Sequence, residues 1–196
     1  MRWRFFGNNF GMTKSLNTNC FQKTLLDAIN LKICSRENER SKDDEDDVFL
    51  KKSIVVVAFG TPLISGDAYA PLVASALKED FDVPVFAYGT TEHPVNAKNM
   101  TEWLDFVKTV HKDSLILAID ASLGEKVGSV VVRKDGVCPA AVKGRKKRFG
   151  DVGVLGVVGS AKGDALVNLM SADFDFVQNM ALDTAKSISS AIEKLF

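Results

Sequence analysis

Cysteine and histidine are scarce in this chain of 196 residues, which holds three cysteines and two histidines. Cys20, Cys34 and Cys138 lie far apart, and their odd number argues against a disulfide framework. They are typical of a reducing compartment, and no spacing among them matches a zinc site. We therefore expect neither structural disulfides nor a metal centre built on cysteine.

The chain also lacks a net charge and a long apolar run. Its 25 Lys and Arg residues balance 25 Asp and Glu residues, so no overall field favours nucleic acid or a membrane surface. The N-terminus, "MRWRFFGNNFGM", is basic and aromatic, but no apolar stretch long enough for a signal peptide or a membrane span follows it. We expect a cytoplasmic protein without nucleic-acid or membrane partners.

Residues 1–50 differ in composition from the rest and are expected to form an N-terminal extension. Leu25, Ile29 and Ile33 recur every four residues, which predicts a short amphipathic helix over 21–34. The stretch "SRENERSKDDEDD" that follows has no apolar residue and is typical of a flexible, solvated linker. Whether the helix docks on the rest of the protein remains open at this point.

Residues 51–196 show the alternation of strands and helices that is typical of a single α/β domain. Apolar runs predict strands at 53–59, 83–88, 114–120, 127–137 and 152–159. Amphipathic patterns predict helices at 67–79, 99–111 and 174–195. The expected fold is a three-layer α/β sandwich, with a mainly parallel central sheet and helices on both faces.

Two aspartates lie at or beyond the carboxyl ends of predicted strands. Asp67 lies in the connection after the first strand, and Asp120 ends the third. Parallel sheets form their binding sites beyond the carboxyl ends of the strands, so a 2-1-3 strand order would bring both carboxylates to one crevice. The glycines in "FGTPLISGD" would let the loop turn tightly toward the sheet edge. A structural alternative is that Asp67 caps a helix and Asp120 caps the short turn "ASLGEK".

Converging carboxylates would share a proton, because two neighbouring carboxylates do not both ionise cheaply. Asp67, at a helix N-terminus, is expected to be held anionic by the helix dipole, and Asp120 to carry the proton. Such a pair can activate water with one member while the other protonates a carbonyl oxygen.

Three segments resemble, in order and spacing, the germination protease of spore-forming bacteria and, more closely, the YyaC-type spore proteins. They read "GTPLISGDAYAP", "LILAIDASLGEKVGSVVV" and "DGVCPAAVKGRKKRFGDVGVLGVVG", and the resemblance spans about residues 53 to 190. It implies a phosphorylase/hydrolase-like fold, shared with hydrogenase maturation peptidases. It also implies catalytic roles for Asp67 and Asp120, in a peptidase-like protein of sporulation or germination that acts on a protein or peptide, such as a small spore protein. The cleft is expected to be lined also by Gly60, Thr61, Gly66, Pro71 and Gly124.

The sequence departs from these families at two places. The family usually shows Leu-Gly-Pro after the first aspartate, whereas this chain reads "AYAP", with Ala70 in place of the glycine. The histidines, His93 and His111, do not stand where the hydrogenase peptidases place their metal-binding histidine, so no metal or other cofactor is expected.

Two further features favour plain structural roles. The basic segment 143–151 is expected to be a solvated loop, and the glycines of 153–165 do not fit a phosphate loop. Ser65 and Ser160 lack a plausible histidine partner for a serine hydrolase.

Three hypotheses follow: an aspartate-dependent peptidase, a catalytically silent sporulation protein that binds a peptide or protein in the same cleft, and a small-anion binder that uses the glycine-rich loops.

Overall fold

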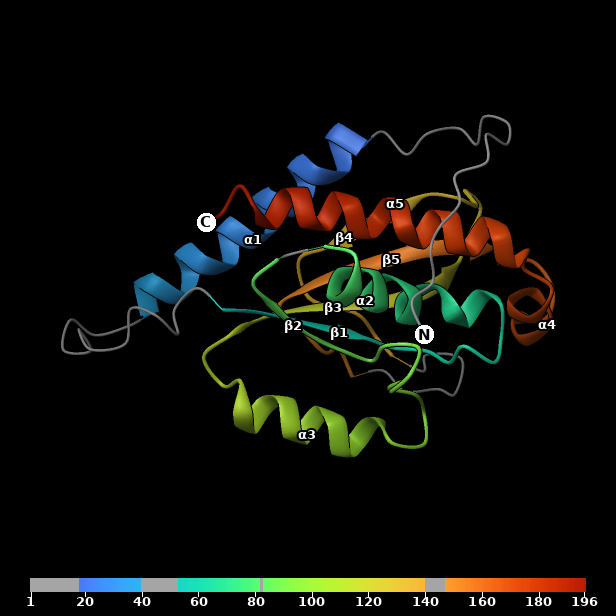
Figure 1. The fold of residues 1–196 in the computed structure, drawn as a ribbon, viewed down its shortest axis with the longest axis horizontal. Helices are drawn as coiled ribbons and strands as arrows, with labels where there is room; N and C mark the ends of the chain where they lie inside the picture. Colours follow the sequence, from blue (N-terminus) through green and yellow to red (C-terminus); the bar gives the residue numbers. More distant parts are fainter. Residues whose placement is uncertain (1–17, 40–52, 82, 140–146) are drawn as a thin grey trace.

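In the computed structural model, a five-stranded sheet lies between two layers of helices (Figure 1). The structure describes residues 18–39, 53–81, 83–139 and 147–196. The strands are β1 (Ile54–Ala58), β2 (Val85–Tyr88), β3 (Leu115–Leu123), β4 (Val130–Arg133) and β5 (Val152–Gly159). Their order is β2-β1-β3-β5-β4, and only β4 runs antiparallel to its neighbour. The expected sandwich, with β1 between β2 and β3, is confirmed.

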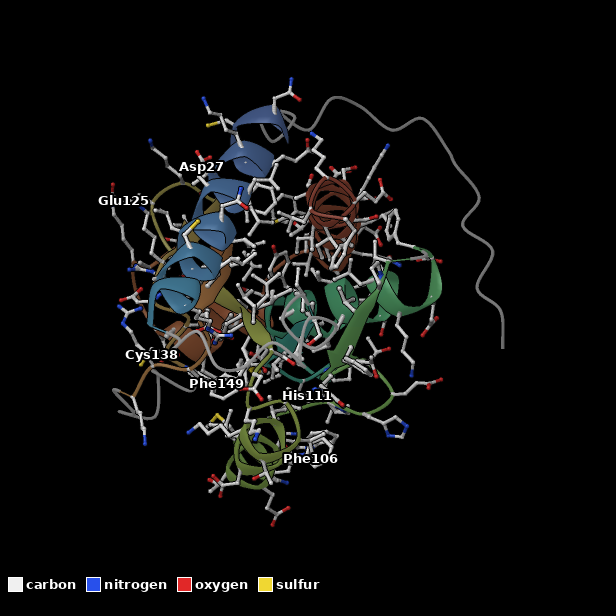
Figure 2. The ribbon with its side chains drawn as sticks, turned by 90° about the vertical axis from the view of Figure 1, so that its left-hand side faces the viewer. Asp27, Phe106, His111, Glu125, Cys138 and Phe149 are labelled. Atoms are coloured by element: carbon white, nitrogen blue, oxygen red, sulfur yellow. The ribbon has the colours of Figure 1, made fainter. Side chains whose placement is uncertain are left out.

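Helices cover both faces of the sheet, which explains why all five residues of β1 are buried. One face packs against α1 (Thr18–Glu39), α2 (Tyr69–Glu79) and α5 (Phe174–Ile192). The other face packs against α3 (Met100–Val110). Figure 2 shows Phe106 and His111 on the α3 side, with α1 and α5 beyond the opposite face. None of the described helices is long and apolar enough to cross a bilayer.

Helix α5 begins where the sequence predicts, because Asp173 caps it. The Asp173 carboxylate accepts a hydrogen bond of 2.7 Å from the Phe176 amide. A buried pair of hydroxyl groups joins α5 to α2, and its hydrogen bonds are satisfied. The buried Tyr69 hydroxyl donates to Thr184 Oγ1 at 3.0 Å, and Thr184 donates in turn to the Met180 carbonyl. A polar pair inside the main core is therefore stable, since none of its hydrogen-bonding atoms is left without a partner.

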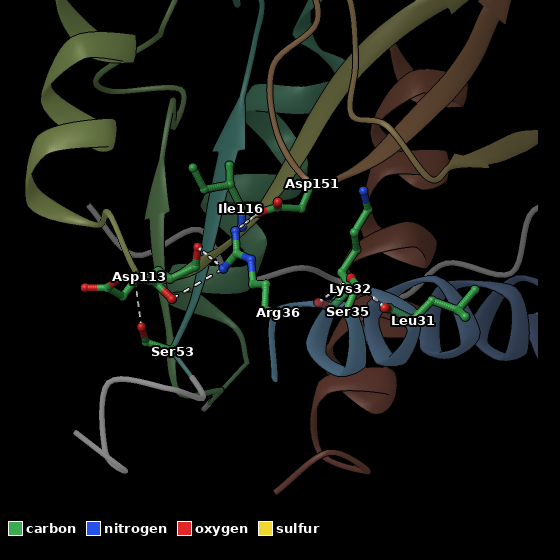
Figure 3. Close-up of polar contacts among 9 residues, drawn as sticks. Leu31, Lys32, Ser35, Arg36, Ser53, Asp113, Ile116 and Asp151 are labelled. Atoms are coloured by element: carbon green, nitrogen blue, oxygen red, sulfur yellow. Dashed lines mark hydrogen bonds and ion pairs between the residues drawn. The ribbon is translucent and has the colours of Figure 1, made fainter. Parts of the chain in front are cut away.

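Helix α1 docks on the domain and extends beyond the predicted range of 21–34. Its buried apolar side chains, Phe21, Leu25, Ala28 and Ile29, join the same core cluster as α2 and α5. Near its C-terminal end, Arg36 donates to Asp151 Oδ2 at 2.8 Å and to the Ser114 carbonyl at 2.9 Å (Figure 3). The folded unit thus includes a helix that precedes the expected boundary at residue 50. The charged stretch beyond residue 39 lies outside the described residues.

The structure corrects three expectations about secondary structure. Residues 121–123, expected in a turn, continue β3, and β4 is shorter than the predicted range of 127–137. A short helix that the sequence analysis did not anticipate, α4 (Ala165–Met170), follows β5.

The start of α4 also argues against the small-anion hypothesis. The Asp164 carboxylate caps α4 and accepts hydrogen bonds from the Leu166 and Val167 amides. An acid thus occupies the position that a bound anion would need.

Candidate active site

The site begins where β1 ends. Gly60 follows the strand, and its amide donates to the Val95 carbonyl at 2.9 Å. Its φ of 146° lies in the region that favours glycine, and a Cβ atom there would lie 2.1 Å from the Asp67 carbonyl oxygen. Glycine at this position therefore lets the chain after Thr61 fold back, so that the segment carrying Asp67 contacts the end of β1.

Asp67 lies in a short 3₁₀ turn, η2 (Gly66–Ala68), immediately before α2. Its Oδ2 accepts a hydrogen bond of 2.8 Å from the Thr61 amide, six residues earlier. The N-cap residue of α2 is Ala68, without a side-chain cap. The alternative role of Asp67 as a helix cap is therefore wrong: its carboxylate is held by the loop.

Asp120 lies within β3 rather than at its end. The last pair between β1 and β3 joins Ala58 to Ile119, so Asp120 lies one residue beyond the end of β1, while it still pairs with Leu155 of β5. Its Oδ1 accepts a hydrogen bond of 2.9 Å from the amide of Ala121. Because the strand continues to Leu123, Asp120 does not cap a turn.

Asp67 and Asp120 line the same cleft, whose volume is about 570 Å³. The two carboxylates thus lie in one crevice, as the strand order 2-1-3 predicts. The cleft has largely apolar walls, formed by residues that include Phe59, Ile64, Val95, Met100, Leu155 and Leu169. Among the residues that the structure describes, three cations also line it, namely Lys98, Arg133 and Arg148.

Two of the five other residues expected to line the cleft, Gly60 and Thr61, are found there. The other three, Gly66, Pro71 and Gly124, are not among the described residues that line it. A Cβ atom on Gly66 would meet α4 and one on Gly124 would meet β5, because both glycines serve close packing. Pro71 is buried in the first turn of α2.

The pKa values of both carboxyl groups are raised, and that of Asp120 more strongly. Burial is the main cause that raises the pKa of Asp120, and the negative charge of Asp67 is the second. The hydrogen bond from the Ala121 amide lowers this pKa only in part, so it stays well above its usual value of 3.8. For Asp67, burial raises the pKa and the hydrogen bond from Thr61 lowers it. The charge of Asp67 acts on Asp120, so the two groups titrate as a pair, and Asp120 is the member that holds the proton.

Each carboxyl group keeps one oxygen open to the cleft. Asp67 Oδ1 and Asp120 Oδ2 make no hydrogen bond with any described residue, and none of the described side chains has a buried oxygen or nitrogen without a partner. These two oxygens therefore reach the open space of the cleft. A water molecule or a substrate atom in the cleft can reach each of them.

Several lining residues escaped the sequence analysis, among them Lys98, Arg133 and Leu155. The strand pattern could have pointed to Leu155, since it lies on the fifth predicted strand beside the third. The position of Arg133 could not be predicted from the sequence, because it depends on the antiparallel pairing of β4 with β5.

Residues 38–193 match a family described as "Protein of unknown function (DUF1256)". The chain belongs to this family. The uncharacterized protein YyaC of Bacillus subtilis (strain 168) is 33% identical over 141 residues, which cover 70% of this chain and 69% of YyaC. The resemblance to YyaC-type proteins is therefore confirmed.

The DUF1256 chain also shares its fold with a solved protease. The NiFe hydrogenase maturation protease HycI from Thermococcus kodakarensis KOD1 matches with a TM-score of 0.50 and 17% sequence identity. The match covers 72% of this chain and 92% of HycI. At this identity the match establishes a peptidase-like α/β fold and nothing about chemistry.

The donor set at the acid pair of this DUF1256 protein does not fit a resident zinc ion. Catalytic metal sites of this kind use about three protein ligands, and within the described part of the chain no three His, Cys, Asp or Glu side chains come together. His93 is exposed and does not line the cleft. His111 Nε2 instead contacts the Tyr88 hydroxyl at 2.8 Å, and burial lowers the pKa of this imidazole.

Proposed function

We propose that this protein is an aspartate-dependent peptidase, in which Asp67 and Asp120 hydrolyse a peptide bond of a protein substrate. The observation that carries this proposal is the pair of carboxyl groups in one cleft, each with an oxygen open to it. Their unequal environments support different roles for the two groups. Asp120, with the higher pKa, is the acid, and Asp67 is the base.

The reaction balances with these two groups and one water molecule. Asp67 takes a proton from the water molecule while the water oxygen forms a bond to the peptide carbonyl carbon. At the same time Asp120 donates its proton to the carbonyl oxygen. The resulting tetrahedral intermediate has a neutral hydroxyl group in place of an oxyanion. Asp67 then protonates the leaving nitrogen as the C–N bond breaks, and Asp120 recovers its proton from the hydroxyl group.

The rest of the cleft supports a peptide as the substrate. The apolar walls of the cleft suit the side chains of an extended peptide. Beyond Ile119, β3 no longer pairs with β1. We infer a role in sporulation or germination from the three segments that resemble the spore germination protease. That setting, and small spore proteins as substrates, are the most specific part of the proposal.

A peptide library tests the activity without knowledge of the substrate. The purified protein is incubated with chymotryptic peptides of a bacterial proteome, and new peptide termini are identified by mass spectrometry. We expect cleavage by the wild type, and its loss in Asp67→Asn and in Asp120→Asn, because each variant removes one proton-transfer group. Asp175→Asn is the control, since Asp175 is an exposed aspartate in the first turn of α5, away from the cleft.

The outcomes separate the two main hypotheses. Cleavage that survives in both aspartate variants contradicts the acid pair as the catalytic machinery. Absence of cleavage by a folded wild type that still retains peptides favours the second hypothesis, a binding protein that uses the same cleft.

A further inference from the structure

Arg133 has no role in the proposed chemistry and, among the described residues, no acidic partner. The charge of Arg148 is matched by Asp135, with contacts of 3.1 Å and 3.2 Å between the guanidinium nitrogens and the carboxylate oxygens. Arg133 also lines the cleft and is exposed, yet none of the carboxylates in the described ranges lies within ion-pair distance of it. Its guanidinium group is thus available to a ligand in the cleft.

The strand register places Arg133 on the same face of the sheet as Asp120. Asp120 pairs with Leu155, and Leu155 pairs with Val131. One row further along, Gly153 pairs with both Ala118 and Arg133. Residues directly opposite each other on neighbouring strands project to the same face, and alternate residues of one strand share a face. Arg133, Val131, Leu155 and Asp120 therefore face the same side.

The spacing of this face matches a short length of extended peptide. Neighbouring strands are about 4.8 Å apart and residues rise about 3.3 Å along a strand, so the backbones at Asp120 and Arg133 are separated by roughly 12 Å. An extended peptide covers that distance in about three to four residues. Leu155 is partly buried and Val131 is 41% exposed, so the surface between Asp120 and Arg133 is apolar.

We propose that Arg133 binds a carboxylate of the peptide, about three to four residues from the bond held at Asp67 and Asp120. The cleft would thus select acidic peptides. A guanidinium group forms two parallel hydrogen bonds with a carboxylate, which makes arginine suited to this recognition. The distance from the scissile bond rests on the proposed peptidase function, whereas the binding of the carboxylate does not.

Lys98 and Arg133 lie at opposite sides of the cleft. Lys98 belongs to the loop after β2, on the other side of β1, and its exposed side chain lines the opposite part of the cleft. A preference set by Arg133 is therefore expected on one side of the scissile bond only.

The library digest described above tests this preference by position. In peptides cut by the wild type, aspartate or glutamate should be enriched at one fixed position, and Arg133→Ala should remove the enrichment. Arg133→Glu should replace it with lysine or arginine, a reversal that a merely structural role would not produce. Lys134→Ala is the matched control, because it removes the same charge from an exposed neighbour that does not line the cleft.

A binding measurement keeps this inference separate from the peptidase proposal. The probes are fluorescein-labelled heptapeptides of alanine and leucine, which carry either glutamate or glutamine three residues from a central leucine. Each is made with a free and with an amidated C-terminus, so that a side-chain carboxylate and a terminal one are distinguished. We expect Arg133→Ala to weaken binding of the carboxylate-bearing probes about tenfold, as for a lost hydrogen bond to a charged group, and to leave the neutral amidated probe unchanged.

Each outcome decides one of the two proposals. Cleavage without an acidic preference, or with a preference that survives in Arg133→Ala, overturns the role of Arg133 and leaves the peptidase standing. Arg133-dependent binding without any cleavage supports the carboxylate site and contradicts the peptidase. Equal binding of all probes by the wild type and Arg133→Ala, without cleavage, overturns both.

Discussion

Asp120 and Asp67 are chemically the same residue, and their surroundings make them different. Asp120 extends from a buried strand, and the charge of Asp67 adds to the effect of burial on its pKa. Asp67 is held by the Thr61 amide, which opposes the rise. The expectation of a proton on Asp120 agrees with the direction of its pKa shift, whereas the expected stabilisation of anionic Asp67 by a helix dipole is not what the structure shows. The hydrogen bond from Thr61 is the stabilising contact instead, and burial still raises the pKa of Asp67.

The raised pKa of Asp120 predicts a pH-dependent cost in stability. The folded protein holds this proton at pH values where the unfolded chain, with its usual pKa of 3.8, has released it. Stability is therefore lost as the pH rises from that value to the folded pKa, by about 1.4 kcal/mol for each pH unit of the interval. Asp120→Asn removes this loss and can still accept the Ala121 hydrogen bond.

We expect Asp120→Asn to be more stable than the wild type at pH 8 and similar to it at pH 4, as measured by urea unfolding at both values. Asp175→Asn, which changes an exposed aspartate, should show no such dependence. A difference between Asp120→Asn and the wild type that stays constant with pH would show that the carboxyl group of Asp120 is not perturbed.

At the scale of elements, the attachment of α1 depends on apolar burial along its length and on one charged contact near its end. The Arg36 guanidinium contacts the Asp151 carboxylate and two main-chain carbonyls near the start of β3 (Figure 3). Asp151 Oδ2 also accepts the Ile116 amide at 2.8 Å, so the same carboxylate joins α1 to the sheet.

Removal of this contact should weaken the whole folded unit. We expect Arg36→Ala to lower the free energy of unfolding by about 2 kcal/mol, because it deletes several charge-assisted hydrogen bonds that are partly shielded from water. Lys23→Ala, at an exposed position on the same helix, should change it little. Chemical denaturation measures both. Equal values for the two variants would mean that α1 is held by its apolar side chains alone.

The elements that the sequence predicted well are those with a strong apolar pattern. Continuous β-branched runs such as that of β1 identify strands buried on both faces, and the four-residue period of α5 identifies its inner side. Helix α4 was missed because it is short and its apolar side chains, Leu166, Val167 and Met170, are exposed. The four-residue spacing of Leu25 and Ile29 indicated one apolar side of a helix, but spacing does not reveal what that side packs against.

At the scale of the whole molecule, topology explains what the sequence could and could not foresee about the site. The buried parallel strands and the 2-1-3 order bring the loop after β1 and the C-terminal half of β3 together, so the convergence of Asp67 and Asp120 could be predicted. The other wall is formed by β5 and the antiparallel β4. Its register is set by tertiary pairing, which no local pattern around Arg133 encodes.

The shared fold and family leave the chemistry to be decided at the cleft itself, since one fold can serve many activities. The central claim is that Asp67 and Asp120 form one titrating pair that holds a proton on Asp120. It can be measured without a substrate, by following the ¹³C chemical shift of the Asp120 carboxyl carbon with pH, in the wild type and in Asp67→Asn. The account predicts that Asp120 titrates well above 3.8 in the wild type and at a lower pH in Asp67→Asn, which removes the neighbouring charge. A titration of Asp120 near 3.8 that is unchanged in Asp67→Asn would contradict it.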